Sequence, residues 1–335
     1  MKNLFRLLGI IAIAAMITFA YISCEGPVGP AGTNGTNGTN GTSAPGAVLT
    51  SQKGITLLWI PAGTFRMGSP GTEYGRGTYE TQHKVTLTRG FYMGKYQVTQ
   101  ELWEEVMTGN TNGISPSPSS FGASPAAGEV QELRPVEYIR WYEVLVFCNR
   151  LSIAEGLTPA YKISGSTNPD SWGTAPTSNN ETWNAVVMES GANGYRLPTE
   201  AQWEYACRAG TTGAFNVSGY SWGGSAYTFA IDPGWFTPNS SGMTHQVGMK
   251  TANAWGLCDM HGNVYEWCWD WYDVNFGSAN AADDATDPMG GGSSVSRIAR
   301  GGSWSNSTLA ARSAYRGYAP PNNQYNITGF RLVRP

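Results

Sequence analysis

The sequence has little charge, little histidine and little sulfur. Of its 335 residues only 13% are charged, histidine occurs three times, cysteine five times, and no cysteine lies beyond Cys268. The formal net charge of −3 leaves no basic excess for a nucleic acid, so we expect no nucleic-acid partner. The chain is instead rich in glycine (43), tyrosine (17) and tryptophan (13), which indicates loops packed around aromatic anchors and not a helical bundle.

The longest apolar run lies at the N-terminus. Lys2 and Arg6 precede 17 mostly apolar residues, and Cys24 follows directly. A basic start and a run shorter than the ~20 residues of a membrane-spanning helix predict a signal peptide over residues 1–23. The context of Cys24 resembles a bacterial lipobox, so we expect this cysteine to be lipidated. The protein would then be an exported bacterial lipoprotein of the cell envelope, anchored at the outer surface. An ordinary signal peptide or an uncleaved anchor is the alternative.

Residues 24–50 contain a short glycine repeat. Glycine recurs at every third position from Gly26 to Gly41, the period of collagen, in which only glycine fits the axis of three wound chains. The run is short, and its last three triplets contain no proline. We therefore expect a flexible tether, with a trimerising stalk as the alternative, followed by one domain over residues 51–335.

Patterning in that domain predicts an α+β fold with two main helices around short antiparallel sheets. Apolar residues recur at helical spacing between Pro135 and Gly156. Thr199 and Gln202 have the T-x-x-Q spacing of a capping box, and Thr99 is the expected start of a shorter helix. Long loops connect these elements, which is uncommon unless the loops carry function.

Short strands are expected around the helices. Residues 55–67 predict two strands joined by a Pro-Gly turn, and residues 328–335 predict a closing strand in which apolar residues alternate with arginines. Trp267, Trp269 and Trp271 alternate, which places three indoles on one face of a strand.

Eight sequence blocks in the same order resemble the formylglycine-generating enzyme (sulfatase-modifying factor) family over roughly residues 55–335. The blocks are IPAGTFRMGS, VTQELWEEVM, PVEYIRWYEVLVFCNRLS, GYRLPTEAQWEYACRAG, NAWGLCDMHGNVYEWCWDWY, RGGSW, RSAYR and GFRLVRP. The resemblance implies a loop-rich variant of the C-type lectin fold, in agreement with the predicted α+β class.

The chain departs from this family at the catalytic centre. The founding enzymes oxidise a sulfatase cysteine with copper and oxygen, through two cysteines that follow the RGGS-aromatic block. Two thiolates are the soft ligand set that Cu(I) requires. Here Ser305, Asn306, Ser307 and Thr308 follow that block, and no cysteine does. We therefore expect no enzyme and no catalytic residue, with formylglycine generation as the alternative.

Other redox chemistry also lacks its usual ligands. Iron-dependent members of the family need clustered histidines, and His83, His245 and His261 are widely spread. By themselves the four cysteines of the domain allow two disulfides in three pairings. The family's usual disulfide partners are missing, so the resemblance implies that Cys148 and Cys207 are reduced.

The resemblance further implies one structural calcium in the block DMHGNVYEW. By position its ligands would be Asp259, Gly262, Val264 and Glu266, through side chains at the ends and backbone carbonyls between them. Hard oxygen donors from a tight turn suit Ca²⁺. The alternative is that Asp259 and Glu266 brace the loop without metal, and no cofactor is required.

The end of the chain is similar to a second group with this fold, the variable proteins of diversity-generating retroelements. There a reverse transcriptase rewrites adenines in a copy of the C-terminal segment, so asparagine codons vary between fixed framing blocks. Residues 305–328 contain four Asn, three Ser and three Tyr, and no Lys, Asp, Glu, Trp, Met, Cys or His. Tyrosine supplies contact area at low entropic cost, and Ser, Gly and Asn supply adaptable hydrogen bonds, as in antibody loops.

We therefore expect a non-catalytic, surface-exposed lipoprotein that binds a ligand through a variable C-terminal surface. The expected ligand is a protein on another cell or on a host surface, and a structural envelope or assembly protein is a further alternative. Arg312 and Arg316 are expected as buried braces, with Trp304 and Phe330 as core anchors. The expected contact residues are Ser305, Ser307, Thr308, Leu309, Gly317, Tyr318, Ala319, Asn323, Tyr325 and Ile327, of which the two tyrosines are the expected hot spots.

Overall fold

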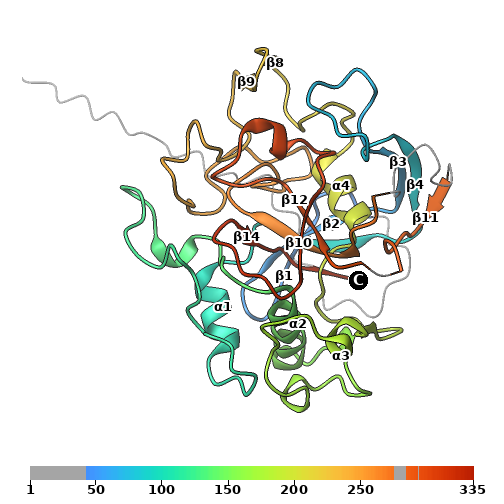
Figure 1. The fold of residues 1–335 in the computed structure, drawn as a ribbon, viewed down its shortest axis with the longest axis vertical. Helices are drawn as coiled ribbons and strands as arrows, with labels where there is room; N and C mark the ends of the chain where they lie inside the picture. The colour runs from blue at the N-terminus through green and yellow to red at the C-terminus, as the bar shows by residue number, and fades with distance from the viewer. Residues whose placement is uncertain (1–42, 275–283, 293) are drawn as a thin grey trace, which may run out of the picture. The chain divides into compact units, whose positions relative to one another are not determined.

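The computed structural model describes residues 43–274, 284–292 and 294–335 (Figure 1). The predicted signal peptide, the lipidation site Cys24 and most of the predicted tether lie outside the described residues. Within them, no helix combines the length and the apolar character needed to cross a membrane.

The helices begin largely where the sequence predicts. They are α1 (Gln100–Met107), α2 (Trp141–Ala154), α3 (Glu181–Asn184) and α4 (Glu200–Arg208), with 3₁₀ turns η1 (Gln131–Leu133), η2 (Pro169–Ser171) and η3 (Thr308–Ala311). Thr99 Oγ1 accepts a hydrogen bond from Leu102 N at the start of α1. Thr199 and Gln202 form the predicted capping box of α4. Helix α2 starts later than expected, because Tyr138 adopts a left-handed φ of 62° that a helix cannot include.

The strands form several small sheets. One sheet contains β1 (Val48–Thr50), β2 (Thr56–Ile60), β5 (Phe91–Gly94) and β15 (Val333–Arg334). The second, in spatial order, contains β13 (Gly317–Ala319), β12 (Arg297–Arg300), β10 (Tyr265–Trp271) and β14 (Thr328–Gly329). A third contains β11 (Asp284–Thr286), β4 (His83–Leu87) and β3 (Gly63–Met67), and β6 (Tyr161–Lys162) with β7 (Val187–Met188) and β8 (Tyr220–Trp222) with β9 (Tyr227–Phe229) form two-stranded ribbons. Pairing is antiparallel except between β10 and β14 and between β11 and β4. Strand β1 lies inside the segment predicted as tether, so the folded sheet begins at Val48.

The closing strand predicted over residues 328–335 is wrong as a single strand. Strand β14 pairs with β10, whereas β15 pairs with β5 in a different sheet. Between them Phe330, Arg331 and Leu332 are all buried, so the arginine does not alternate outward to solvent as the predicted strand required. The arginine is the physical reason, because Glu266 and the carbonyl of Gly94 accept its hydrogen bonds inside the domain.

The aromatic residues build the core around α2 and β10. Trp267 and Trp269 are buried and Trp271 is half-buried. The guanidinium of Arg297 lies 3.4 Å from the ring centroid of Trp271 and 5.3 Å from that of Trp269, so two of the three indoles predicted to share a face of β10 contact the same arginine. A charge held between indole rings is favourable because the ring faces carry negative potential.

The four cysteines of the domain are buried and form no disulfide. They are Cys148, Cys207, Cys258 and Cys268. Burial raises the pKa of the Cys207 thiol to about 12, so this cysteine is a neutral thiol near neutral pH. The two-disulfide alternative is therefore not realised, in agreement with the expected reduced state of Cys148 and Cys207.

Candidate functional site

The framing blocks at the C-terminus are RGGSW, RSAYR and GFRLVRP. Buried arginines in these blocks pair with glutamates that come earlier in the chain. Arg300 pairs with Glu204, and Arg316 Nε donates to Glu200 Oε1 at 2.7 Å. Both carboxylates project from α4 four residues apart, so one helix holds two framing blocks. Arg331 pairs with Glu266 on β10 through two hydrogen bonds of 2.6 and 2.7 Å.

Arg312 pairs with two carboxylates. Its Nη1 donates to Glu73 Oε1 at 2.6 Å and to Glu80 Oε2 at 2.8 Å, and its Nη2 donates to Glu80 Oε1 and to the carbonyl of Gly75. The predicted buried braces Arg312 and Arg316 are confirmed. The pairing of Arg312 with Glu73 and Glu80 also holds the loop of residues 69–80 against the C-terminal segment.

Glycine in the block RGGSW allows the segment to close on itself. Gly302 has a φ of +73°, and a Cβ built there would lie 2.9 Å from both the carbonyl oxygen of Ala310 and the Cα of Ala311. Any side chain would therefore be both strained and in contact with backbone. Residues 303–309 form a loop pinned at its base by this close approach.

The predicted contact residues divide into a displayed set and a supporting set. Ser305, Ser307, Tyr318 and Tyr325 are exposed, and Asn323 is partly exposed. Tyr318 is 57% exposed and stacks on Tyr272 with ring centroids 4.1 Å apart. Asn323 Nδ2 donates to Tyr325 Oη at 2.7 Å, which orients the second exposed ring.

Two of the predicted contact residues belong to the frame of the segment, Thr308 because it is buried and Gly317, although partly exposed, because no side chain fits there. Thr308 is buried, its Oγ1 accepting from Tyr227 N at 2.8 Å and donating to Tyr227 O at 3.2 Å. Gly317 lies in β13, where a Cβ would meet the carbonyl oxygen of Ala299 at 2.8 Å and the ring of Tyr265 at 2.9 Å. Their small or polar character in the sequence resembles that of display residues, but both belong to the frame.

The remaining contact candidates lie at the margin of the core. Leu309 packs against the small cluster that contains Phe215 and Tyr227. Ala319 and Ile327 are partly buried against the main core. Ligand contact by these residues stays a prediction.

Trp304 differs from the sequence expectation, because it is half-buried and Phe330 alone is a core anchor. Its Nε1 donates to the carbonyl of Asn326 at 3.0 Å. This bond joins the two ends of the C-terminal segment, because Trp304 precedes Ser305 and Asn326 follows Tyr325. Figure 1 shows the red C-terminal segment running from the turn of η3 past β12 and β14.

Two segments beside the C-terminal segment, the loop of residues 69–80 and strand β8, were not predicted as part of the exposed surface, because they are distant in the sequence. Tyr74, in the loop of residues 69–80, is 57% exposed and stacks on Trp222 of β8 with ring centroids 5.1 Å apart. Tyr227 Oη donates to the carbonyl of Tyr74. The backbone N–H of Tyr227 donates to Thr308 Oγ1, so both of these segments are connected to η3. The only signal in the sequence was the length and the Gly/Tyr content of the loop.

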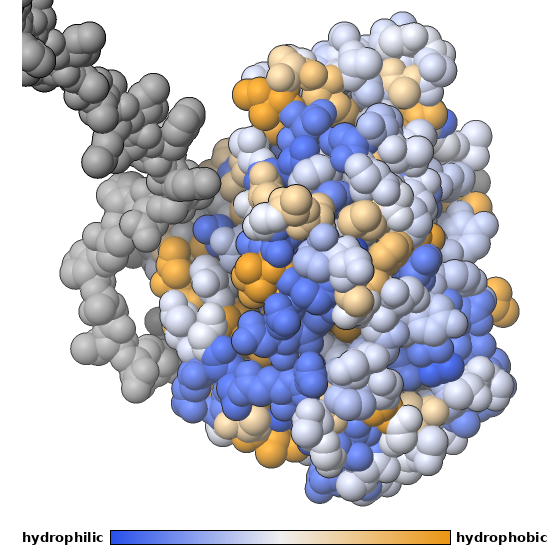
Figure 2. All heavy atoms as spheres, turned by 90° about the vertical axis from the view of Figure 1, so that its left-hand side faces the viewer, coloured by the Kyte–Doolittle hydropathy of each residue, from blue (hydrophilic) through white to orange (hydrophobic). Residues whose placement is uncertain are grey.

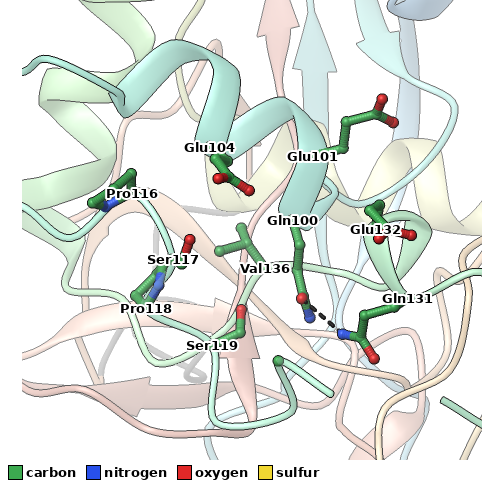
Figure 3. A pocket seen from close by; sticks show the side chains of 11 residues that line it. Gln100, Glu101, Glu104, Pro116, Ser117, Pro118, Ser119, Gln131, Glu132 and Val136 are labelled. Carbon is green, nitrogen blue, oxygen red and sulfur yellow. Dashed lines mark hydrogen bonds between the residues drawn. The ribbon is translucent and has the colours of Figure 1, made fainter. Parts of the chain in front are cut away.

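A small hollow lies beside the C-terminal surface (Figure 3). Its volume is about 130 Å³, and its walls come from the start of α1, from η1 and from the loop of residues 116–122. Phe121, in that loop, packs edge-on against Trp304 with ring centroids 5.2 Å apart. Figure 3 shows the carboxylate of Glu104 at one side of the hollow and the Gln100–Gln131 hydrogen bond at another. Figure 2 shows this side of the domain as mostly hydrophilic, with scattered apolar residues.

His261 contacts the C-terminal segment at Ala311 and predicts that the stability of the fold depends on pH. Its Nδ1 lies 2.7 Å from the carbonyl oxygen of Ala311, and its Nε2 accepts from Asn216 N at 3.2 Å. Burial lowers the pKa of His261 to about 4. Between pH 6.5 and pH 4 the unfolded chain therefore binds a proton that the folded chain does not, so stability falls as the pH falls.

We expect the free energy of unfolding of the wild type, relative to that of His261→Gln, to fall by about 3 kcal/mol from pH 7 to pH 4. Urea denaturation of both proteins across this range is the measurement. The difference between the two proteins cancels the titration of other buried groups. A difference that does not change with pH would contradict the assignment.

The four residues predicted as calcium ligands each place an oxygen near the amide nitrogen of Gln97, but Asp259 does so through its backbone carbonyl and not through the predicted side chain. Four oxygens, from the carbonyls of Asp259, Gly262 and Val264 and from Glu266 Oε1, lie 3.0–3.3 Å from Gln97 Nε2. The Oδ1 of Asp259 is buried with no hydrogen-bond partner. An excess of buried oxygen atoms over N–H donors suits a hard cation, so these residues fit Ca²⁺. Calcium itself stays a prediction.

The geometry defines a loop-rich α+β domain in which a frame of buried arginines and glycines holds a C-terminal segment whose exposed residues are uncharged. Residues 47–335 match the family described as "Sulfatase-modifying factor enzyme 1-like domain". The chain belongs to this family, which confirms the predicted family and fold class.

Three similar proteins show the range of the family. "Chaperone protein LppX" of Paenibacillus barcinonensis is 36% identical over 264 residues, 75% of this chain and 81% of the relative. The formylglycine-generating enzyme of Mus musculus is 27% identical over 82% of this chain and 73% of its own. The solved structure of "Treponema denticola variable protein 1" superposes with a TM-score of 0.72 and 35% identity, covering 84% of this chain and 95% of that one. Similar proteins thus include a chaperone, an enzyme and a variable protein.

Proposed function

We propose that this chain is an exported lipoprotein without catalytic activity that binds a partner protein through residues 305–328. The observation that carries the proposal is the division of the segment into a buried frame and an uncharged display. Arg312 and Arg316 are buried and paired, whereas Ser305 before them and Tyr318 and Tyr325 after them are exposed. Such a segment accepts side-chain changes at the display positions without disturbing the charges that hold it.

The similarity to a variable protein supports a diversified segment. That relative is 35% identical over 84% of this chain. A retroelement that rewrites adenines would change asparagine codons such as that of Asn323 and leave the arginine and glycine frame in place. In this proposal Cys24 carries the lipid anchor and the partner lies on another cell or on a host surface.

The test is DNA sequencing of the 3′ end of the gene from many clones, continued past the stop codon. We expect substitutions confined to codons 305–328 and a nearby near-copy that differs only at adenines. The codons of Gly302, Arg312 and Gly317 should not vary, because these residues belong to the frame. An invariant 3′ end without a copy would contradict diversification.

A chaperone is a second candidate, which the 36% identity to LppX favours. The exposed stack of Tyr74 on Trp222 offers apolar area to a non-native chain. If this function is correct, a stoichiometric amount of the protein should suppress light scattering of a heat-denatured substrate such as citrate synthase. The variant Tyr74→Ala with Trp222→Ala should lose that effect, and unchanged scattering with wild-type protein would exclude it.

A further inference from the structure

Tyr138, shortly before helix α2, has a backbone conformation that its side chain does not favour. Its φ is 62°, in the left-handed region that glycine and asparagine adopt readily and that a bulky aromatic residue rarely adopts. The neighbouring residues Glu137 and Ile139 are fully buried, whereas Tyr138 is 42% exposed. The turn therefore leaves an aromatic residue in solvent at a position where asparagine would fit with less strain.

The side chain of Tyr138 has no partner that would account for the choice of residue. Within residues 43–274, 284–292 and 294–335, its hydroxyl makes no hydrogen bond and its ring contacts no other aromatic ring. The backbone makes the structural contacts instead. Tyr138 N donates to the carbonyl of Tyr325 at 3.1 Å, and Gln324 Nε2 donates to the carbonyl of Tyr138 at 3.0 Å. Any residue other than proline can make these two bonds, so the fold does not require tyrosine here.

The residue that caps α2 departs from local preference in the same way. Arg140 is the N-cap, a position at which Ser, Thr, Asp and Asn are favoured. Its Nε donates to the carbonyl of Asn322 in the C-terminal segment at 3.1 Å, and its Nη1 pairs with Glu143 at 2.7 Å. Residues that break a local rule are expected at functional sites. Tyr138 and Arg140 both do so, and both contact the C-terminal segment.

These contacts extend the C-terminal surface beyond the segment itself. After β13, which contains the exposed Tyr318, the chain reaches Pro321, whose carbonyl accepts from Trp141 N at 3.1 Å. It continues to Tyr325, which is bonded to Tyr138. In Figure 1 the red C-terminal segment reaches the green helix α2. Two exposed tyrosines of the segment and one from outside it are thus connected by a short run of backbone contacts.

The exposed residues along this run are uncharged. No charged residue occurs from residue 317 to residue 330, and Asn323 and Tyr325 both reach solvent. Arg140 and Glu143, at the start of α2, pair with each other. Tyrosine rings and amides without charge suit a partner surface that is itself uncharged and partly apolar.

From these observations we infer that Tyr138 is a binding residue of the C-terminal surface and that it recognises an uncharged, partly apolar patch on the partner protein. Tyr138 lies outside residues 305–328, so a change of sequence within that segment leaves it in place. Each partner then meets the same exposed ring together with a different set of side chains. The inference rests on the proposed function and adds a residue to its surface.

Substitution at Tyr138 separates binding from folding, because the two should change in opposite directions. Tyr138→Asn relieves the left-handed strain and removes the ring, so the melting temperature should rise by about 2–4 °C and affinity should fall at least about tenfold. Tyr138→Phe keeps the ring and should keep affinity within about threefold of that of the wild type. Ser164→Asn is the matched control, since Ser164 is exposed and has a φ of 49° in the turn after β6. Affinity should not change in this control.

The experiment uses the full chain and peptides selected on it from a random display library. Only peptides that lose binding to the variant Tyr318→Ala with Tyr325→Ala are kept, because this loss assigns them to the C-terminal surface. Biolayer interferometry then gives their affinities for the variants at residues 138 and 164, and differential scanning calorimetry gives the melting temperatures. Raising the salt concentration from about 0.05 M to about 0.5 M should change these affinities by less than about threefold, because salt screens charged contacts and not uncharged ones.

Four results would overturn the inference, and they differ in meaning. If the kept peptides bind Tyr138→Asn as tightly as the wild type, the C-terminal surface binds partners but Tyr138 is not part of it. If Tyr138→Asn lowers the melting temperature, the ring stabilises the fold and affects binding only through the structure. A large loss of affinity at high salt would contradict the uncharged patch. If no selected peptide depends on Tyr318 and Tyr325, the proposed function fails and the role of Tyr138 fails with it.

Discussion

Replacing Arg312 by methionine is expected to lower the free energy of unfolding by about 3–5 kcal/mol. The guanidinium is fully buried and donates to two carboxylates, those of Glu73 and Glu80, and to the carbonyl of Gly75. Methionine fills much of the same volume but leaves the buried carboxylate of Glu80 without its cation. Burial already raises the pKa of Glu73, so this carboxyl can take up a proton when the arginine is lost.

Replacing Arg312 should also loosen the structure around it under conditions in which the whole domain is still folded. Because Arg312 joins the loop of residues 69–80 to the segment that follows η3, its loss should increase amide hydrogen exchange in both. Urea denaturation and hydrogen exchange by mass spectrometry measure the two quantities. The double variant Arg312→Met with Glu80→Gln should recover part of the stability, because it removes the unpaired charge.

Arg66→Met is the control for this prediction. Arg66 is exposed on β3, and its replacement should change the free energy of unfolding by no more than about 0.5 kcal/mol. A loss below about 1 kcal/mol for Arg312→Met would show that the buried ion pair does not hold the frame.

Removing both exposed tyrosines of the C-terminal surface should abolish binding and leave the fold intact. In the variant Tyr318→Ala with Tyr325→Ala, affinity for a bound partner should fall by more than about 100-fold, because each aromatic hot spot contributes about 2 kcal/mol or more. The two side chains are 57% and 38% exposed, so the free energy of unfolding should change by no more than about 1 kcal/mol.

The measurement uses peptides enriched from a random display library on the wild-type protein, with affinities determined by biolayer interferometry. Ile153→Ala is the control, since Ile153 is 50% exposed but lies on α2, outside the C-terminal segment. Equal binding by wild type and double variant would show that the selected peptides use another surface, and the proposed function would lose its main support. Loss of binding in the control would point to a general effect on the fold.

Local features were predictable because their causes are local. The caps at Thr99 and Thr199 use bonds to backbone three residues away, so their spacing is visible in the sequence. The late start of α2 was not visible, because Tyr138 leaves helical geometry where its N–H bonds the carbonyl of Tyr325. The closing strand failed for a similar reason, since Arg331 turns inward toward a partner on β10.

By itself the sequence determined the family, the position of the framing blocks and the uncharged segment between them, because glycines, arginines and missing cysteines are read directly. Tertiary structure alone decided which residues of that segment face solvent. Thr308 and Ser307 are similar hydroxyl residues, yet the first is buried against Tyr227 and the second is exposed. Distant contacts also decided the partners of the arginines, 116 residues away for Arg316 and 239 for Arg312. Burial and pairing depend on what the rest of the chain packs against a residue, and that information is not local.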